Sequence, residues 1–209
     1  KATFVAEDIG IIWDATQPQK HGQITDSTLS KAISNLLDKG VEIITITAGG
    51  PVGQGSSMLA TRKAVERATE EEVLVVASIG NDRKPNPIYP AVWKEVLAVG
   101  ASELIGNAWT KADFNNTFDG IDVYAPGSHV VPFVKGAYKV SSGPPNETTF
   151  NEVDFDGEAE IAGTSFAVPI AAGAAAARSY RSKVQGAEAD RLRVAARAVL
   201  DGLPGFVSQ

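Results

Sequence analysis

Ser165 has the local surroundings that a catalytic serine requires. It stands in residues 163–169, Gly-Thr-Ser-Phe-Ala-Val-Pro, and an apolar, alanine-rich run continues to residue 177. This pattern predicts a buried helix whose first turn carries Ser165, where backbone N–H groups have no partner and the helix dipole is positive. Such N–H groups can hold an oxyanion beside the hydroxyl. Taken alone, the motif is more typical of a serine that caps a core helix. Other parts of the sequence are therefore needed to distinguish a capping serine from a catalytic one.

Asn81 is a second candidate for the same chemistry. It follows Gly80, after the largely β-branched run of residues 73–79. At the end of a buried strand, its side-chain amide would donate a hydrogen bond to a developing oxyanion, together with the backbone N–H of Ser165. The competing interpretation is a turn asparagine in a left-handed conformation, which accounts for most Gly-Asn-Asp triplets.

The glycine-rich loop at residues 48–55 follows a β-branched segment at residues 41–47. Such a loop can bind phosphate, but it lacks both the G-x-G-x-x-G spacing and the G-K-[ST] ending, so nucleotide binding is the weakest hypothesis. A strand edge without bulky side chains could instead pair with the backbone of a peptide. Close packing of the glycines explains the loop equally well. The residues concerned are Thr47, Ala48, Gly49 and Gly50.

The alternation of strands and helices predicts an α/β fold. Residues 3–13 are expected to form a strand that gives way, within this range, to an irregular apolar passage. Further strands are expected at residues 41–47, 73–79, 96–101 and 121–124. Helices are expected at residues 27–40, 57–72, 164–177 and 188–200. This order implies right-handed crossovers and a parallel sheet with helices on both faces. Ligands of such sheets bind outside the carboxyl ends of the strands, where the 48–55 loop, Asn81 and Ser165 fall together.

Length and composition are those of one globular unit. With 44% hydrophobic and 21% charged residues, we expect a single unit over residues 1–209, with residues 135–159 as an exposed inserted loop. The net charge of −6 argues against nucleic acid as the main partner, and no apolar run reaches membrane-spanning length. The absence of cysteine excludes disulfides, thiol catalysis and zinc–thiolate sites. Two sequons, at Asn115 and Asn146, slightly favour secretion but leave the compartment open.

Several motifs together resemble the subtilisin family of serine peptidases. Residues 163–169 are similar to the family's nucleophile motif, residues 47–51 to its substrate-pairing strand and pocket edge, and residues 77–82 to its oxyanion-asparagine segment. Three more segments occur in the family's order: residues 89–91, 96–101 and 122–127. One such motif carries little weight, whereas six in order carry much. The resemblance covers nearly the whole chain except residues 135–159.

The resemblance implies a subtilisin-like, parallel-sheet α/β/α sandwich and hydrolysis of peptide or protein substrates by an Asp-His-Ser triad. It makes Ser165 the nucleophile and Asn81 the side-chain donor to the tetrahedral oxyanion. Two segments would frame the pocket for the residue before the cleaved bond: Thr47, Ala48, Gly49 and Gly50, and Ala77, Ser78, Ile79 and Gly80. No metal or other cofactor is expected, although calcium is frequent in the family. Asp122 is the one carboxylate here to connect with a weak cation site, and an ordinary role in a turn is the favoured interpretation of it.

The chain departs from the family at the first two triad positions. The family order is Asp, then His, then Ser, and the first residues here already resemble the strand that follows the histidine helix, so we expect an N-terminally truncated fold. His21 lies in a polar turn with no small-residue helix after it, and His129 follows the turn at residues 126–127. A serine without a base is a poor nucleophile, so the isolated chain should be nearly inert as a peptidase.

Two hypotheses follow for the function. In the first, the chain is the C-terminal part of a serine endopeptidase whose aspartate and histidine lie on an N-terminal fragment or a partner chain. In the second, it is a catalytically dead subtilisin-like protein that binds peptides or serves as a scaffold. In both, removing the first part of a doubly wound sheet leaves apolar faces and an unpaired strand edge, so we expect a partner chain or self-association to cover them.

Overall fold

The computed structural model describes residues 3–7, 24–52, 57–132, 135–142 and 149–208. Its helices are α1 (Asp26–Asp38), α2 (Leu59–Glu70), α3 (Thr164–Ala177), the 3-10 helix η1 (Tyr180–Lys183) and α4 (Arg191–Leu200). Its strands are β1 (Ile43–Ile46), β2 (Gly50–Pro51), β3 (Leu74–Ser78), β4 (Ile88–Tyr89), β5 (Val96–Ile105), β6 (Ala108–Lys111), β7 (Val123–Pro126), β8 (Ser128–Pro132), β9 (Gly136–Ser142), β10 (Thr149–Phe155), β11 (Glu158–Ala162) and β12 (Val207–Ser208). Within these ranges, every helix is too short or too polar to span a bilayer.

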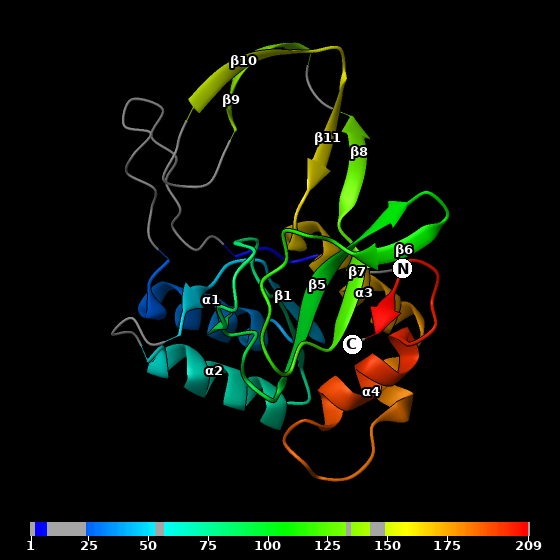
Figure 1. The fold of residues 1–209 in the computed structure, drawn as a ribbon. Coiled ribbons are helices and arrows are strands. Elements are labelled where there is room, and N and C mark those ends of the chain that lie inside the picture. The colour runs from blue at the N-terminus through cyan, green and yellow to red at the C-terminus, as the bar shows by residue number, and fades with distance from the viewer. Residues whose placement is uncertain (1–2, 8–23, 53–56, 133–134, 143–148, 209) are drawn as a thin grey trace.

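The predicted parallel sheet lies at the centre of the molecule (Figure 1). Its order is β1-β3-β5-β7-β12, in which the first four strands run parallel and β12 pairs antiparallel with β7. Strand β6 pairs antiparallel with the far half of β5. Helices α1 and α2 cover one face of the sheet, and α3 and α4 cover the other. The α/β fold expected from the sequence is therefore confirmed.

Alternating side chains divide the core into two layers, because successive residues of a strand point to opposite faces. In β3, Val75 and Ala77 belong to the core beneath α1 and α2, whereas Leu74 and Val76 belong to the core beneath α3 and α4. All of β3 is buried, as expected for a parallel strand covered on both sides. This central strand leads directly into Asn81.

The α1–α2 layer is held by apolar contacts and by a shared cap. The residues of α1 that pack on the sheet lie one helical turn apart: Leu29, Ile33 and Leu37. The first turn of α1 also carries Asp26, whose carboxylate accepts hydrogen bonds from the N–H groups of Ala60 and Thr61 at 2.9 and 2.7 Å. The N-cap residue of α2 makes no side-chain hydrogen bond to the helix, so Asp26 of the neighbouring helix α1 acts as the cap of α2.

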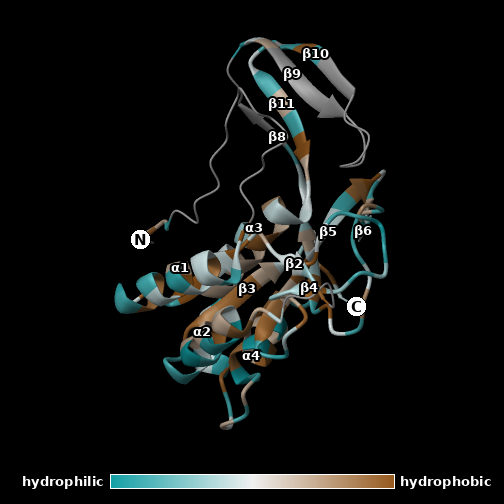
Figure 2. Ribbon diagram, turned by 90° about the vertical axis from the view of Figure 1, so that its left-hand side faces the viewer, coloured by the Kyte–Doolittle hydropathy of each residue, from teal (hydrophilic) through white to brown (hydrophobic). Residues whose placement is uncertain are grey.

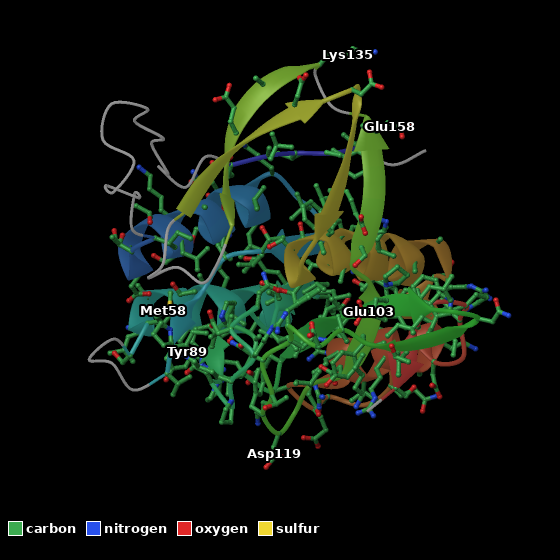
Figure 3. The ribbon with its side chains drawn as sticks, turned by 45° about the horizontal axis from the view of Figure 1, so that its top comes forward. Met58, Tyr89, Glu103, Asp119, Lys135 and Glu158 are labelled. Carbon is green, nitrogen blue, oxygen red and sulfur yellow. The ribbon has the colours of Figure 1, made fainter. Side chains whose placement is uncertain are left out.

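The described residues of the stretch 128–162 form an arm that projects from the sheet (Figure 1). At its base β8 pairs with β11, and farther out β9 pairs with β10. Lys135 and Glu158 lie between the two strand pairs, at the outer end of the β8–β11 pair (Figure 3). The described residues of the stretch expected as an inserted loop, 135–159, are thus mainly antiparallel β-structure.

Strand β1 has an open edge, since within the described residues only β3 pairs with it. Residues 3–7, predicted to begin a strand, belong to none, and the Phe4 side chain is 93% exposed. They are attached to α1 through Glu7, which pairs with Lys39 and accepts a hydrogen bond from Asn35 at 3.0 Å. A strand forms only beside another strand, and none of the described segments lies against residues 3–7 in this way. The rest of that prediction, residues 8–13, falls outside the described residues.

Candidate active site

Ser165 is the second residue of α3, in the turn whose N–H groups lack intrahelical partners. Before the helix, the N–H of Gly163 donates to the carbonyl of Gly127 at 2.9 Å, which ties the start of α3 to the end of β7. The Ser165 side chain is half-buried, and its Oγ donates to the carbonyl oxygen of Thr47 at 3.4 Å. The hydroxyl therefore lies just beyond the carboxyl end of β1.

Asn81 is fixed beside Ser165 by hydrogen bonds from Thr164. The Oδ1 atom of Asn81 accepts one bond from the Thr164 backbone N–H and one from the Thr164 hydroxyl, both at 3.0 Å. Thr164 is fully buried, so its donors are held rigidly. With Oδ1 engaged twice, the amide nitrogen Nδ2 is left as the donor, and it bonds to no other described residue.

The site therefore presents two hydrogen-bond donors next to one hydroxyl. One is Asn81 Nδ2, and the other is the backbone N–H of Ser165 at the positive end of the α3 dipole. Donors fixed before the reaction stabilise negative charge that develops on a carbonyl oxygen, because they need no rearrangement when it forms. This arrangement suits attack by the serine hydroxyl on an acyl carbon.

The two predicted pocket segments lie at the same edge of the sheet. Strands β1 and β3 are parallel neighbours with Ile46 opposite Ala77, so residues 47–50 and 79–80 leave the sheet side by side. A Cβ on Gly49 would collide with the carbonyl oxygen of Tyr89, which shows how closely the backbone of β4 approaches the backbone of Gly49. In Figure 3, Tyr89 lies near Met58 on this side of the molecule.

The pocket segments differ in what they expose. Thr47 and Gly49 are exposed, and Ala48, Gly50 and Gly80 are half-buried. The side chains of the other three predicted residues are buried inside the protein: Ala77, Ser78 and Ile79. Those three residues could meet a ligand through their backbone atoms only.

Sequence reasoning assigned no role to two residues that contact this site, Thr164 and Asn116. Thr164 lies inside the recognised motif, so the motif itself was the available signal. Asn116 is fully buried and bonds to the segment around Asn81, but in the sequence it stood out only as the middle of a sequon. The sequon's own Asn115 is 6% exposed and its amide bonds to Ala101 and Ala112, so a glycan does not fit there in the folded chain. Asn146 falls outside the described residues.

Among the described residues, His129 is the one histidine, and its ring is engaged away from Ser165. His129 lies in β8, and its Nε2 is 3.1 Å from the carbonyl oxygen of Pro126, with which it shares a hydrogen bond. His21 falls outside the described residues.

Asp122 does not resemble a cation site. It accepts hydrogen bonds from the Ala98 N–H at 2.9 Å and from Arg193 at 2.6 Å. Burial raises the pKa of Asp122 above its ordinary value, and the Ala98 N–H and the Arg193 guanidinium oppose that rise. Its carboxylate thus joins the sheet to α4. In the described part of the chain, no three acidic or histidine side chains cluster as metal ligands would.

Comparison with known proteins identifies the family. The profile of the subtilase family matches residues 4–197. The chain belongs to the subtilase family. Thermitase of Thermoactinomyces vulgaris is 28% identical to it over 184 residues, which cover 88% of this chain and 55% of thermitase. Subtilisin BL of Lederbergia lenta is 31% identical over 150 residues, 72% of this chain and 46% of that subtilisin.

Solved structures agree with the family assignment. The prenylagaramide maturation protease PagA is 30% identical, with a TM-score of 0.57 over 83% of this chain and 56% of PagA. The patellamide maturation protease PatA is 28% identical, with a TM-score of 0.58 over 85% of this subtilase chain and 58% of PatA. The fold is therefore subtilisin-like, and the family acts on peptide or protein substrates. The chain spans about half the length of the curated relatives it matches.

Proposed function

We propose that this chain carries the nucleophile and the oxyanion hole of a serine endopeptidase. Ser165 Oγ attacks the carbonyl carbon of a peptide bond while its proton passes to a histidine base, and Asn81 Nδ2 and the Ser165 N–H hold the oxyanion that forms. The proton then passes to the departing amine, and water hydrolyses the remaining ester. The observation that carries the proposal is the pair of hydrogen bonds from Thr164 to Asn81 Oδ1, since they leave the amide donor free beside Ser165.

The substrate is proposed to lie along two backbone segments. Residues Thr47 to Gly50 would pair with the extended peptide, and Ala77 to Gly80 would form the facing wall of the pocket for the residue before the cleaved bond. The proximity of Ser165 Oγ to the Thr47 carbonyl supports this, because a peptide paired there passes the hydroxyl. We also propose that residues 1–209 act as one subtilisin-like unit in which residues 135–159 are an insertion.

The histidine and aspartate are proposed to come from a segment outside residues 1–209 or from another chain. Two surfaces that meet at Ser165 support this: the open edge of β1 and the outer side of α3. On α3, Pro169, Ile170 and Gly173 are exposed although the helix contains no charged residue. A strand along β1 and a helix along α3 would bury both surfaces and end beside the hydroxyl. Without them the chain should be nearly inactive.

The alternative function is that of a catalytically dead protein that binds peptides or acts as a scaffold. The observation that favours it is the hydrogen bond from Ser165 Oγ to the Thr47 carbonyl, because the hydroxyl is engaged by a backbone oxygen rather than by a base. The peptide-pairing edge would serve such a protein equally well.

Labelling with a fluorophosphonate, measured by intact mass, separates the two functions. We expect Ser165 to react in the native protein or complex that contains this chain, and not in residues 1–209 alone. Ser165→Ala should abolish the label, and Ser182→Ala, at an exposed serine in η1 beyond the far end of α3, should leave it unchanged. No label at Ser165 in either sample would favour the binding or scaffold function.

A further inference from the structure

Every hydrogen bond described for Asn116 goes to the segment around Asn81. Its Oδ1 accepts from the N–H of Asp82 at 2.8 Å, and its Nδ2 donates to Asp82 Oδ2 and to the carbonyl of Asn86, both at 3.2 Å. Its backbone N–H donates to the carbonyl of Gly80 at 3.1 Å. The residues immediately before and after Asn81 are therefore both fastened to one fully buried side chain and its backbone.

The contact between Gly80 and Asn116 leaves no room for a side chain. Gly80 has a φ of +94°, and a Cβ at this position would collide with Asn116 Nδ2. The chain thus passes directly over the Asn116 amide on its way to Asn81. Any shift of that amide would be passed to the Asn81 backbone without a flexible side chain to absorb it.

Asp82 places a carboxylate one residue from the oxyanion donor. A negative charge that moved toward the reacting carbonyl would oppose the negative charge that develops there. The hydrogen bond from Asn116 Nδ2 holds Asp82 Oδ2 in one position. Asn116 therefore restrains both the favourable group, Asn81, and the unfavourable one, Asp82.

We propose that Asn116 is a positioning residue for the hydrolysis: it sets the distance from Asn81 Nδ2 to the oxyanion and anchors the carboxylate of Asp82. This rests on the proposed function of Asn81. Enzymes lose up to about 100-fold in rate when a catalytic group moves by 1 Å, so the position of a buried amide behind the donor matters to the rate.

The neighbouring Asn115 provides a matched control. It is also buried, and its side chain also makes three hydrogen bonds, but these go to Ala101 and Ala112 in the β5–β6 region. In the complete, active protein we expect Asn116→Ala to lower kcat by about 10- to 100-fold with KM changed less than about 3-fold. Asn115→Ala should lower Tm by a similar amount and leave kcat within about 3-fold. Equal effects of the two variants on kcat would overturn the proposal.

A double-mutant cycle shows whether Asn116 acts through Asn81. If it does, Asn81→Gly combined with Asn116→Ala loses much less kcat than the two single losses multiplied together, because the donor being positioned is already gone and only the restraint on Asp82 is left to lose. Fully additive losses would refute the positioning role. If Asn81→Gly alone keeps its kcat, the oxyanion proposal itself fails, which is a distinct result.

Exchanging the side chains of Asn116 and Asp82 tests the restraint on Asp82. This test does not require that the Asn116→Ala variant be stable. Asn116→Asp sets two carboxylates against each other and should lower kcat by about 10-fold or more. Adding Asp82→Asn restores a donor–acceptor pair between the two side chains, while the hydrogen bond to the Asn86 carbonyl stays lost, so we expect kcat to recover at least about 3-fold over that of Asn116→Asp alone. No recovery in the exchanged pair, with both variants folded by circular dichroism, would contradict the proposed role.

Discussion

Helices α2 and α3 lie on opposite faces of one sheet, yet their outer sides differ in character. The twelve residues of α2 include five charged ones: Arg62, Lys63, Glu66, Arg67 and Glu70. Two of its arginines pair with Glu66 and Asp38 on the outer surface. The fourteen residues of α3 include no charged one, and the Ile170 side chain is 40% exposed. Figure 2 shows hydrophilic colour on the outer turns of α1 and α2 and little of it on α3.

Under the proposed function, this difference separates a layer that is complete from one that a further segment would cover. A helix that is apolar on all sides is normally buried on all sides, whereas α2 has a polar side suited to water. The proposed nucleophile belongs to the side that we propose is covered, since Ser165 lies at the start of α3. Changes near α3 should therefore affect activity and assembly, and changes in the α1–α2 layer should affect stability.

The largest effect is expected at the start of α3. Ser165→Ala should lower kcat of the complete protein by at least about 10⁴-fold, in line with the magnitude known for subtilisin itself. Stability should change by less than about 0.5 kcal/mol, because the hydroxyl makes one long hydrogen bond. Peptide hydrolysis and thermal unfolding measure the two. Retained hydrolysis would exclude Ser165 as the nucleophile.

The outer side of α3 should control assembly. Ile170→Glu puts a charge on the surface proposed to be covered, so it should weaken association with the segment that supplies the histidine by about 10- to 100-fold. Leu59→Glu is the control, since that side chain is 64% exposed on α2. It should leave association unchanged. Equal binding of the two variants, measured by calorimetry, would show that α3 is not the covered surface.

A smaller effect on rate is expected when Asn81 loses one of its two restraints. Thr164→Val keeps the shape of the buried side chain but removes the hydroxyl that donates to Asn81 Oδ1. One net hydrogen bond is worth about 1 kcal/mol, so kcat should fall by about 5- to 10-fold while the N–H of residue 164 still holds the amide. A fall in kcat in steady-state kinetics, with Tm unchanged, would support this prediction. A fall in Tm with kcat unchanged would show that the Thr164 hydroxyl serves stability and does not position Asn81.

The smallest effect should lie in the α1–α2 layer and depend on pH. Burial opposes ionisation of Asp26, but hydrogen bonds from the Thr61 hydroxyl and from the N–H groups of Thr61 and Ala60 outweigh it and lower the pKa of Asp26. A lowered folded-state pKa means that this stabilisation is present above the unfolded-state pKa of about 4 and is lost as pH falls through the folded-state value.

Asp26→Ala should therefore cost about 1 kcal/mol of unfolding free energy at pH 7 and progressively less as the pH falls below about 4, with kcat unaffected. Urea unfolding at pH 7 and pH 3 measures the difference. Asp119→Ala, at an exposed loop position, serves as the control. A cost that is the same at both pH values would show that the charge of Asp26 does not act as the cap of α2.

The sequence predicted the local parts of this molecule well. The strands around Ile44, Val76 and Leu97 are mainly β-branched or apolar, so the burial of these three residues in a parallel sheet followed from composition. The GTS motif marked the start of α3. The strand expected at residues 3–13 was different, because its formation depends on a neighbour that the pattern within the strand does not specify.

What the sequence by itself determined is which segments form the helices and the buried parallel strands and which residue types stand at their ends, since periodicity and turn residues act over a few positions. Only the tertiary structure decided that Thr164 holds Asn81, and that Asn116 fastens the segment around it while Asn115 does not. Two adjacent asparagines look alike in a sequence. Their roles differ because neighbouring residues of an irregular segment point to different partners, and those partners are brought together only when the sheet closes.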